Sequence, residues 1–415
     1  MFPGLPEYQP DPIRTAAVRL EVKGLQAVRK KHPWVFEDSI LKMSGDLRTG
    51  DIAVIFDNRK KLGAGLFDPG NEIRIRMVSY GATAKDIGLE LFHELAAKAA
   101  ARRKGLFGAE TDAYRLINGE SDGFSGLAAD RYADVLAIKV YSAVWLRYLP
   151  AVAEALQGSF EGLQRLVIRL SRDVAGLSLK QRFGYEDGML FGGQDWDGTV
   201  QFHENGLTFE TNVRFGQKTG FFLDQRENRA RVGEYAANCG KVLNVFAYSG
   251  GFSLYAAARG ALEVTDLDFS KPALEASERN FSLNTHIPGI ARCKHRTISG
   301  DAFVEMKKLA DKGERFDVVI VDPPSFAKSS LERKQALNSY SKLAVLALRL
   351  LKKGSLLVFA SCSSRVSADE LFDEVHRTAR SCGSPLKELE RRAEAPDHPA
   401  DFRESHYLKC LYARK

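Results

Sequence analysis

From about residue 240 the sequence repeats one rhythm, in which a short apolar run is followed by a turn and a helical segment. The apolar runs read "KVLNVFAY", "EVTDLDFS", "RTIS", "FDVVIVDPP" and "SLLVFASCSS", and long helices are expected over about 331–351 and from about 368. Continuous apolar strands that alternate with helices predict an α/β fold, in which helices cover both faces of a parallel sheet. Ligands of such folds bind at the carboxyl ends of the strands.

The length of 415 residues exceeds what one ordinary hydrophobic core supports, so two or three domains are expected from length alone. Short alternating runs such as "VRLEVKGL" and "DIAVIFDN" read as strands and predict a small β-barrel over 15–83. Helical periodicity over 87–104 and 144–157, with strand-like runs between them, predicts a central α+β domain over 84–200. The turn-rich stretch "FGGQDWDGTV" marks its end, and the α/β domain is assigned to 201–415.

The net charge of +7 and the isoelectric point near 9.0 favour a polyanionic partner, although many basic proteins bind no nucleic acid. The five cysteines include no C-x-x-C pair, which argues against a disulfide framework and a zinc site and favours a reducing cytosol. The first residues include early Glu and Asp and form no apolar run, so no signal peptide is expected. The longest apolar run, Val242 to Ala258, is broken by Asn244 and Ser249, so no membrane span is expected.

The ends of the first three strands carry groups that suit an adenosine-containing ligand. Gly250 and Gly251 let the backbone approach a ligand at a helix N-terminus, although a tight turn would need the same residues. Asp268, about 20 residues further on, suits the two hydroxyls of a ribose. Asp301 can accept from an adenine amine or cap a helix. The full G-x-G-x-x-G of dinucleotide enzymes is absent, which argues against NAD.

Asp322 ends the fourth strand and is followed by two prolines, which hold the backbone rigid. A carboxylate fixed there can bind the amine edge of a base. The alternative is that Asp322 belongs to a loop before a helix, which we consider less favourable because an unpaired acid after "VVIV" is costly when buried.

Cys362 lies at the end of the fifth strand, in "FASCSS". Free cysteine is commonly a small buried hydrophobe, and that interpretation fits the other four cysteines well. They are Cys239, Cys293, Cys382 and Cys410. The interpretation as a buried hydrophobe fits Cys362 less well, because three serines flank this residue. A thiolate that adds to carbon 6 of a pyrimidine makes carbon 5 nucleophilic, which is covalent catalysis. Because a free thiol has a pKa of about 8.5, the site should lower that pKa or supply a base.

The segment "RKKHPWVFEDSI" interleaves cations with aromatic rings, as a nucleic-acid surface does. Its candidate RNA-binding residues are Arg29, Lys30, Lys31, His32 and Trp34. The alternative is that Trp34 is a core residue and the lysines are simply solvated.

Taken together, these motifs point to a family. "NVFAYSGGFS", "DLDFSKPALEASERN", "GDAF", "FDVVIVDPPSFAKS" and "LLVFASCSS", with "GQKTGFFLDQRENR" upstream, resemble the RlmI-type large-subunit (23S) ribosomal RNA 5-methylcytosine methyltransferases. The segment "RKKHPWVFEDSI" resembles their N-terminal PUA domain, and "NGESDGFSGLAADRYADVLAIKV" is similar to their hairpin-rich central domain. The resemblance implies a Rossmann-like class I methyltransferase fold for 201–415. It also strengthens the RNA-binding interpretation of Trp34 and its basic neighbours.

The resemblance implies S-adenosylmethionine as the cofactor, with the segment from Lys218 to Arg226 closing over it. The expected cofactor-binding residues are Lys218, Thr219, Asp224, Arg226, Phe246, Tyr248, Gly250, Gly251, Asp268, Asp301, Asp322 and Pro323. The catalytic residues would be Asp322, which holds the base, and Cys362, the nucleophile. The implied partner is large-subunit ribosomal RNA in the cytoplasm, with no metal and no membrane. A homodimer is left open.

One residue departs from the pattern. Many RNA 5-methylcytosine enzymes carry a second cysteine just after the fourth-strand prolines, where it helps release the product, and this chain has Ser325 there. Relatives with similar "DPP" loops methylate guanine without a covalent step, so a guanine N-methyltransferase is the first alternative. An RNA-binding or ribosome-assembly factor with a residual cofactor fold is the second.

Overall fold

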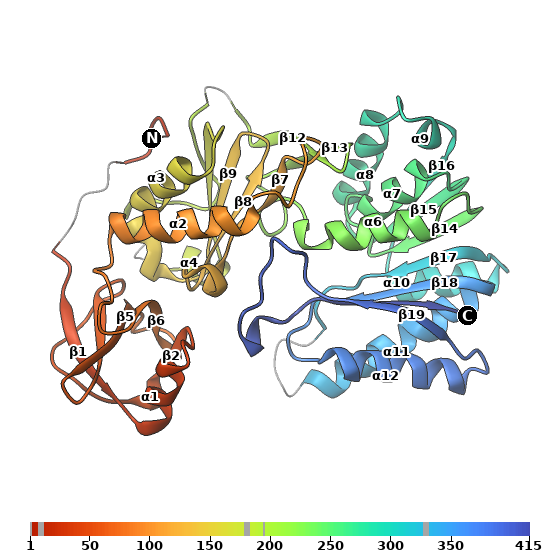
Figure 1. Ribbon diagram of the computed structural model, residues 1–415. Helices are drawn as coiled ribbons and strands as arrows, with labels where there is room; N and C mark the ends of the chain where they lie inside the picture. The colour runs from red at the N-terminus through yellow and green to blue at the C-terminus, as the bar shows by residue number, and fades with distance from the viewer. Residues whose placement is uncertain (1, 7–11, 178–182, 194–195, 327–331) are drawn as a thin grey trace. The chain divides into compact units, whose positions relative to one another are not determined.

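The computed structural model describes residues 2–6, 12–177, 183–193, 196–326 and 332–415 (Figure 1). Its chain divides into two compact units. The first unit comprises residues 1–203, 211–223 and 396–402, and the second comprises 204–210, 224–395 and 403–415. Within the described residues, no helix combines the length and the apolar character that a bilayer crossing requires.

The first unit contains a six-stranded sheet in the order β2-β6-β5-β4-β1-β3. Its strands are β1 (Thr15–Leu20), β2 (Trp34–Phe36), β3 (Ile40–Met43), β4 (Ile52–Asp57), β5 (Lys60–Phe67) and β6 (Ile73–Tyr80). The expectation that "VRLEVKGL" is one strand is wrong, because β1 ends at Leu20 and helix α1 (Val22–Arg29) follows. Gly24 and Val28, one helical turn apart, form its buried face. A side chain at Gly24 would crowd Ser39 and Leu20, so glycine lets α1 lie close to the sheet.

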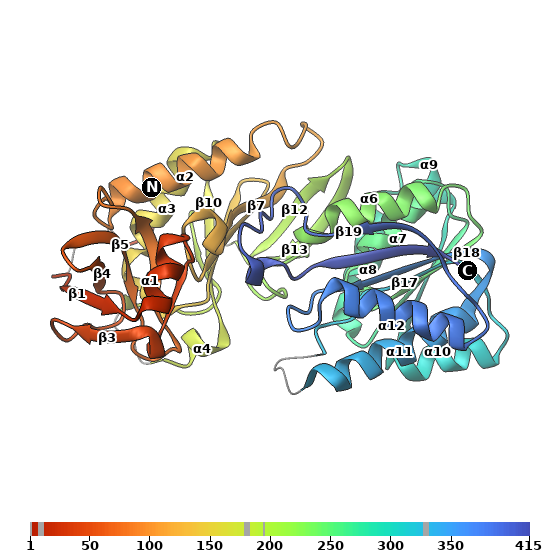
Figure 2. The same ribbon diagram turned by 60° about the horizontal axis from the view of Figure 1, so that its bottom comes forward.

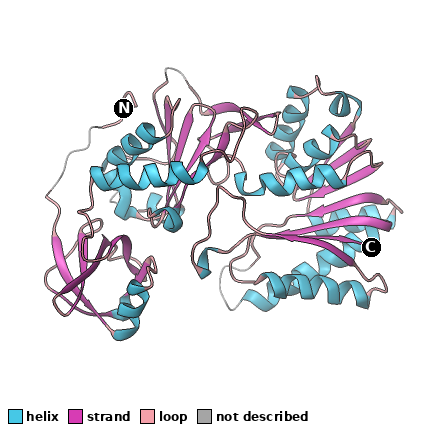
Figure 3. Ribbon diagram, in the orientation of Figure 1, coloured by secondary structure: helices cyan, strands magenta, loops and turns pink. Residues whose placement is uncertain are grey.

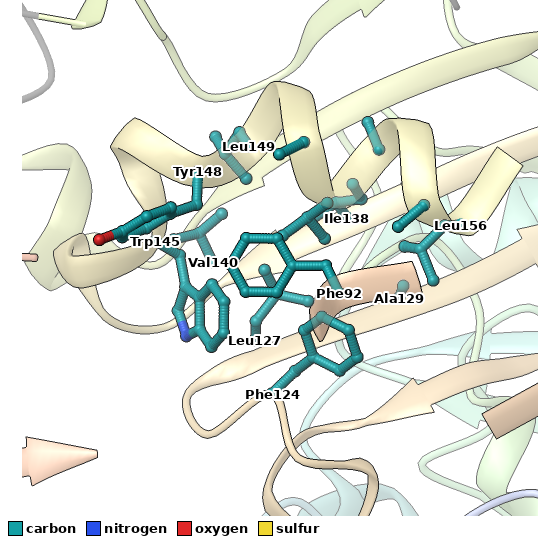
Figure 4. Packing of buried hydrophobic residues seen from close by; sticks show 14 of the residues in the cluster. Phe92, Phe124, Leu127, Ala129, Ile138, Val140, Trp145, Tyr148, Leu149 and Leu156 are labelled. Carbon is teal, nitrogen blue, oxygen red and sulfur yellow. The ribbon is translucent and has the colours of Figure 1, made fainter. Parts of the chain in front are cut away.

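A second sheet of the same unit has five strands in the order β11-β10-β9-β8-β7. They are β7 (Ala113–Asn118), β8 (Leu127–Tyr132), β9 (Val135–Val140), β10 (Arg165–Leu170) and β11 (Met189–Phe191). Helices α2 (Leu89–Arg103) and α3 (Leu149–Ser159) confirm the two predicted helices. Residues 143–148 are 3-10 helix instead, since Pro150 lacks the N–H of a preceding α-turn. Phe92, Phe124 and Trp145 pack together in the core (Figure 4). Because both sheets belong to one compact unit, the boundary at residue 83 stays a prediction.

The second unit is built on a seven-stranded sheet in the order β16-β15-β14-β17-β18-β20-β19. Figure 3 shows the strands in magenta and the helices that pack against them in cyan. Its strands are β14 (Lys241–Val245), β15 (Glu263–Asp268), β16 (Lys294–Ser299), β17 (Phe316–Val321), β18 (Leu351–Ser361), β19 (Lys387–Arg392) and β20 (Lys409–Arg414). The first five strands in chain order pair in parallel, which confirms the predicted parallel sheet. The strand order reverses between β14 and β17, and such a switch point is where α/β sheets bind ligands.

Helices cover both faces of this sheet, with α6, α7 and α8 on one face and α10, α11 and α12 on the other (Figure 2). The helices are α6 (Arg226–Tyr235), α7 (Gly251–Ala258), α8 (Lys271–Leu283), α9 (Pro288–Arg292), α10 (Ala302–Asp311), α11 (Arg333–Leu350) and α12 (Ala368–Ser381). The two antiparallel strands at one edge, β20 and β19, were not expected from the sequence. Strand β20 pairs with β18 along its whole length, so it borders the strand that ends before Cys362.

Candidate active site

The loop after β14 has an unusual backbone. Phe246, Tyr248 and Gly250 all have positive φ, at 62°, 49° and 74°. Left-handed conformations cost energy in residues other than glycine, and they concentrate at ligand-binding sites. The hydroxyl of Ser249 is buried in this loop without a hydrogen-bond partner among the described atoms. A strained loop with an unsatisfied donor, at the N-terminus of α7, fits a polar ligand at the switch point.

Gly250 is required for packing as well as for its dihedral angle. A Cβ atom there would lie 1.9 Å from Ser277 Oγ and 2.8 Å from Asp266 Oδ2. The glycine therefore lets the loop lie directly against the buried polar core, and Gly251 begins α7 behind it.

Asp266 is the centre of that core, and the sequence did not single it out. Its fully buried carboxylate accepts hydrogen bonds from Asn244 Nδ2 at 3.0 Å, Ser277 Oγ at 2.6 Å and Ser253 Oγ, and lies 2.9 Å from His295 Nε2. These partners belong to β14, β16, α7 and α8, so one carboxylate joins the elements around the loop that follows β14. The available signal was an acid in the interior of a predicted strand, between Thr265 and Leu267.

Asp268 lies at the end of β15, where it was expected. Its Oδ2 accepts from the Tyr248 N–H at 2.9 Å and its Oδ1 accepts from the Ser270 N–H at 2.8 Å. A carboxylate has about four acceptor positions, so capacity remains for ribose hydroxyls. The next residue, Phe269, is 82% exposed and was missed. An exposed aromatic ring beside this acid provides an apolar face for a flat ring such as adenine.

Asp301 acts as a helix cap, which was one of its two expected roles. Its Oδ1 accepts from the Val304 N–H at 3.0 Å at the start of α10. The residue is exposed, so its second oxygen can face a ligand.

Asp322 follows β17 and is oriented by a chain of side-chain hydrogen bonds. Gln225 Nε2 donates to Asp322 Oδ2 at 2.8 Å, and Asn228 Nδ2 donates to Gln225 Oε1 at 2.6 Å. The Tyr412 hydroxyl lies 3.2 Å from Asn228 Oδ1 and completes the chain. With Pro323 buried beside it, the carboxylate has one fixed orientation. Gln225 lies inside the predicted cofactor segment, but its contact with Asp322 was not foreseen.

The predicted cofactor segment divides between the two units. Lys218 and Thr219 belong to the first unit, where Thr219 is buried and its hydroxyl donates to Asp130 at 2.6 Å. The Lys218 ammonium lies 4.7 Å from the centre of the Phe222 ring. These two residues are therefore not brought into the same unit as the strand-end groups, and their role in cofactor binding stays a prediction.

Asp224 and Arg226 belong to the second unit, together with the strand-end groups. Asp224 accepts from the Tyr407 hydroxyl at 2.7 Å. Arg226 is the first residue of α6, is almost fully buried, and donates to Glu227 at 3.1 Å. Asp224 and Arg226 thus belong to the same unit as the strand-end groups, and their role in cofactor binding stays a prediction as well.

Cys362 directly follows the last residue of β18 and is half-buried. The preceding Ser361 is buried, with its Oγ 2.8 Å from the Tyr340 hydroxyl and accepting from the Ser363 N–H at 3.2 Å. In the sheet, Phe359 pairs with Val321 of β17, so Cys362 and Asp322 leave neighbouring strands at the same edge. Burial raises the pKa of Tyr340, and the charges of both Cys362 and Asp322 raise it further.

Lys409 was missed by the sequence analysis. It is the first residue of β20, pairs with Ser361 across the sheet, and is 4% exposed. Its ammonium donates to the carbonyls of Ser363 and Val366, the latter at 2.5 Å. Burial lowers the pKa of Lys409 to about 8, while the charge of Cys362 opposes that effect. The signal was a lysine in the apolar run "YLKCLYA".

The other cysteines lie in different surroundings. Burial raises the pKa of Cys239 to about 12 and that of Cys293 to about 11, and it also raises the pKa of the fully buried Cys410. Three of them therefore hold protonated thiols. The expectation that Cys382 is buried is wrong, because it caps the C-terminal end of α12 and is exposed.

The predicted RNA-binding residues lie at the end of α1 and in β2. Lys30 and Lys31 are exposed, while Arg29 forms an ion pair with Asp57. Trp34 is half-buried, and its indole N–H donates to Glu120 Oε1 at 3.0 Å. Trp34 therefore has a structural role, and the exposed lysines carry the stronger argument for phosphate contacts.

His32 completes the set, with its Nδ1 accepting from the Trp34 N–H at 3.2 Å. Its ring meets the rings of Trp34 and Phe402 edge-on, at centroid distances of 5.8 and 6.0 Å. These three aromatic residues form one cluster in the first unit.

A parallel sheet with its switch point at β14 and β17, a left-handed loop after the first strand and an acid after the second define a class I S-adenosylmethionine-dependent methyltransferase. Comparison with known proteins agrees, since residues 118–414 match the S-adenosylmethionine-dependent methyltransferase family and residues 18–80 match a PUA-like domain. A relative from Deinococcus radiodurans, named ribosomal RNA large subunit methyltransferase, is 42% identical over 96% of this chain and 98% of its own. A second relative, from Alteromonas mediterranea and named ribosomal RNA large subunit methyltransferase I, is 32% identical over 96% of this chain and 98% of its own. The chain belongs to the ribosomal RNA large subunit methyltransferase I family.

Solved structures share the fold at lower sequence identity. A methyltransferase crystallised with SAH is 20% identical, with a TM-score of 0.80 over 97% of this chain and 100% of that one. An S-adenosylmethionine-dependent methyltransferase from Streptococcus mutans is 20% identical, with a TM-score of 0.79 over 96% of this chain and 100% of that one. At this identity the likeness establishes the fold alone.

Proposed function

We propose that this protein methylates carbon 5 of a cytosine in large-subunit (23S) ribosomal RNA, with Cys362 as covalent nucleophile. The observation that carries the proposal is the position of Cys362 at the polar end of β18, beside the end of β17 where Asp322 is fixed. The names of the relatives and the PUA-like domain support ribosomal RNA as the substrate. The net charge of +7 and the exposed Lys30 and Lys31 agree with a polyanionic partner.

The residues at the strand ends fit S-adenosylmethionine. The left-handed loop with the unsatisfied Ser249 hydroxyl would hold its polar amino-acid part, and Asp268 would accept from its ribose. Phe269 offers an aromatic face to the adenine, and Asp301 an acceptor for its amine. S-adenosylmethionine supplies an electrophilic methyl group on a sulfonium sulfur, which carbon 5 of the base takes up.

The covalent step uses the thiolate of Cys362, whose lone pair forms a bond to carbon 6 of cytosine. The π electrons of the carbon 5–carbon 6 bond then make carbon 5 nucleophilic. As the methyl group bonds to carbon 5, its bond to the sulfonium sulfur breaks. A general base then takes the carbon 5 proton, the electron pair of that bond restores the carbon 5–carbon 6 double bond, and the sulfur–carbon 6 bond breaks to release the thiolate. Asp322, oriented by Gln225, would hold the N3/N4 edge of the base and share a proton there.

Ser325 stands where a second cysteine aids product release in many such enzymes, and it is exposed. This substitution favours a second candidate, a guanine N-methyltransferase in which Asp322 and the prolines matter and Cys362 does not.

The test is to incubate the protein with S-adenosylmethionine and ribosomal RNA from a deletion strain, and to identify the methylated nucleoside by mass spectrometry. Cys362→Ala should abolish 5-methylcytosine while calorimetry still detects cofactor binding, and Cys382→Ala should behave as wild type. Undiminished turnover of Cys362→Ala would overturn the covalent step. Methylguanine as the product would establish the alternative.

A further inference from the structure

Lys409 is held against the loop that begins at Cys362. Residues directly opposite in an antiparallel ladder point to the same face of the sheet, and Lys409 is opposite Ser361, the neighbour of the cysteine. The Lys409 ammonium donates to two carbonyls, those of Ser363 and Val366, one and four residues after Cys362. The lysine therefore joins β20 to the segment that positions the thiol.

The charge of Lys409 has little local compensation. Among the described residues, no carboxylate lies within ion-pair distance of its ammonium, and Glu394 acts on it only at longer range. Burying an ammonium without an anionic partner is costly. The lysine nevertheless carries its charge at neutral pH, because its pKa of about 8 lies above that value. The anion that would stabilise this charge is the thiolate of Cys362.

Two other titratable groups belong to elements beside the end of β18, and the charge of Cys362 acts on one of them, Tyr340. Asp322, at the end of β17, is an acid whose negative charge opposes a thiolate. Tyr340 of α11 stays a neutral phenol at neutral pH, since burial raises its pKa. Of these groups, Lys409 alone can stabilise a negative charge on Cys362.

We infer that the Lys409 ammonium stabilises the thiolate of Cys362 and holds its loop, which makes Lys409 a positioning residue for the covalent step. The inference deepens the proposed function and rests on it for its catalytic meaning. An opposite charge near a thiol favours its ionised form, and the charge of Cys362 already acts on the Lys409 ammonium that is bonded to its loop. Lys409 would thus supply the activation that a nucleophilic cysteine requires near neutral pH.

The experiment measures the rate at which iodoacetamide alkylates Cys362 in the full chain across pH, by peptide mass spectrometry. In Lys409→Met the rate at neutral pH should fall about tenfold, because the thiolate is rarer, and should converge with wild type at alkaline pH. Lys409→Arg should keep most of the wild-type rate. A purely structural role would instead alter the rate at every pH.

Lys415→Met is the matched control. Lys415 also has its pKa lowered by burial and donates to two carbonyls, those of Leu348 and Leu351, at 2.7 and 3.0 Å. This variant should leave the Cys362 profile unchanged.

If Lys409→Met does not fold, the inference is tested by the pH dependence of alkylation in the wild-type protein, with the exposed Cys382 as internal reference. Alkylation of Cys362 should reach half its maximum at a lower pH than that of Cys382. The inference is overturned if the two cysteines titrate together, or if a folded Lys409→Met keeps the wild-type profile. Because alkylation needs no RNA, this result is independent of the methylation test of Cys362→Ala.

Discussion

The Glu204 carboxylate and the Arg229 guanidinium form a buried ion pair through two hydrogen bonds, of 2.8 and 2.6 Å. The Tyr255 hydroxyl adds a third bond to Glu204 Oε1, at 3.1 Å. Removing one partner of such a pair leaves an uncompensated buried charge. Glu204→Ala should therefore lower the free energy of unfolding by about 3–5 kcal/mol, as measured by urea denaturation. Glu210→Ala breaks an exposed ion pair with Arg279 and should cost less than about 1 kcal/mol. An equal loss of unfolding free energy in the two variants would contradict a stabilising role for the buried Glu204–Arg229 pair.

Replacement of Gly250 tests the loop that we assign to the cofactor. Gly250→Ala should reduce S-adenosylmethionine affinity at least tenfold and lower the free energy of unfolding by roughly 2 kcal/mol or more, because the new Cβ atom meets Ser277 and a left-handed dihedral disfavours alanine. Calorimetry and thermal unfolding measure the two effects. Gly354 has a similar φ of 78° but open space around it, so Gly354→Ala isolates the dihedral cost, about 1–2 kcal/mol. Unchanged cofactor affinity in Gly250→Ala would remove the loop from the site.

The hydrogen-bond chain to Asp322 predicts graded effects on methylation. Gln225→Ala removes the donor to the carboxylate and should lower the methylation rate about tenfold or more, because a hydrogen bond to a charged group contributes about 1.5–3 kcal/mol. Tyr412→Phe removes only the far end of the chain and should have a smaller effect. Single-turnover kinetics with ribosomal RNA distinguish the two. A larger effect of Tyr412→Phe would show that the chain does not act through Gln225.

Most of the α/β sheet could be predicted, because its central strands are continuous apolar runs between turns. The positions of Asp322 and Cys362 followed from the same pattern, since each comes directly after such a run. Helix α1 was missed because its first residues continue the alternation of β1, and only its packing through Gly24 and Val28 distinguishes it.

The missed site residues depend on contacts between distant parts of the chain. Lys409 meets the Ser363 carbonyl 46 positions away, and Gln225 meets Asp322 across 97 positions. The Thr219 hydroxyl donates to Asp130, 89 positions earlier in the chain. The local sequence around Thr219 does not predict this contact. A motif reports which residue types are present, whereas these assignments require knowing which strand lies beside which.

The exposed lysines at the end of α1 predict a salt-dependent contribution to RNA binding. The double change Lys30→Ala and Lys31→Ala should weaken binding and reduce the slope of log affinity against log salt concentration by about 1–2, since each phosphate contact releases counterions. Filter binding in a KCl series measures the slope. Lys98→Ala, on an exposed face of α2, should leave it unchanged. Trp34→Ala should appear mainly as lost stability, because its indole N–H bonds Glu120. An unaltered slope in the double variant would place the RNA surface elsewhere.

The lowered pKa of Lys409 predicts how stability depends on pH. The folded chain releases this proton near pH 8, whereas the lysine of the unfolded chain has its ordinary pKa of 10.5. Between those values the unfolded state binds more protons, so this group makes the folded state more stable as pH rises. Below pH 8 the cost of the buried charge is fully present. Relative to Lys409→Met, the wild type should therefore gain about 1–3 kcal/mol in free energy of unfolding from neutral pH to pH 10.5. Urea denaturation of both proteins across this range measures the difference, in which the contributions of buried groups that are not coupled to Lys409 cancel. A constant difference would mean that Lys409 titrates as an exposed lysine and is not confined by the Cys362 loop.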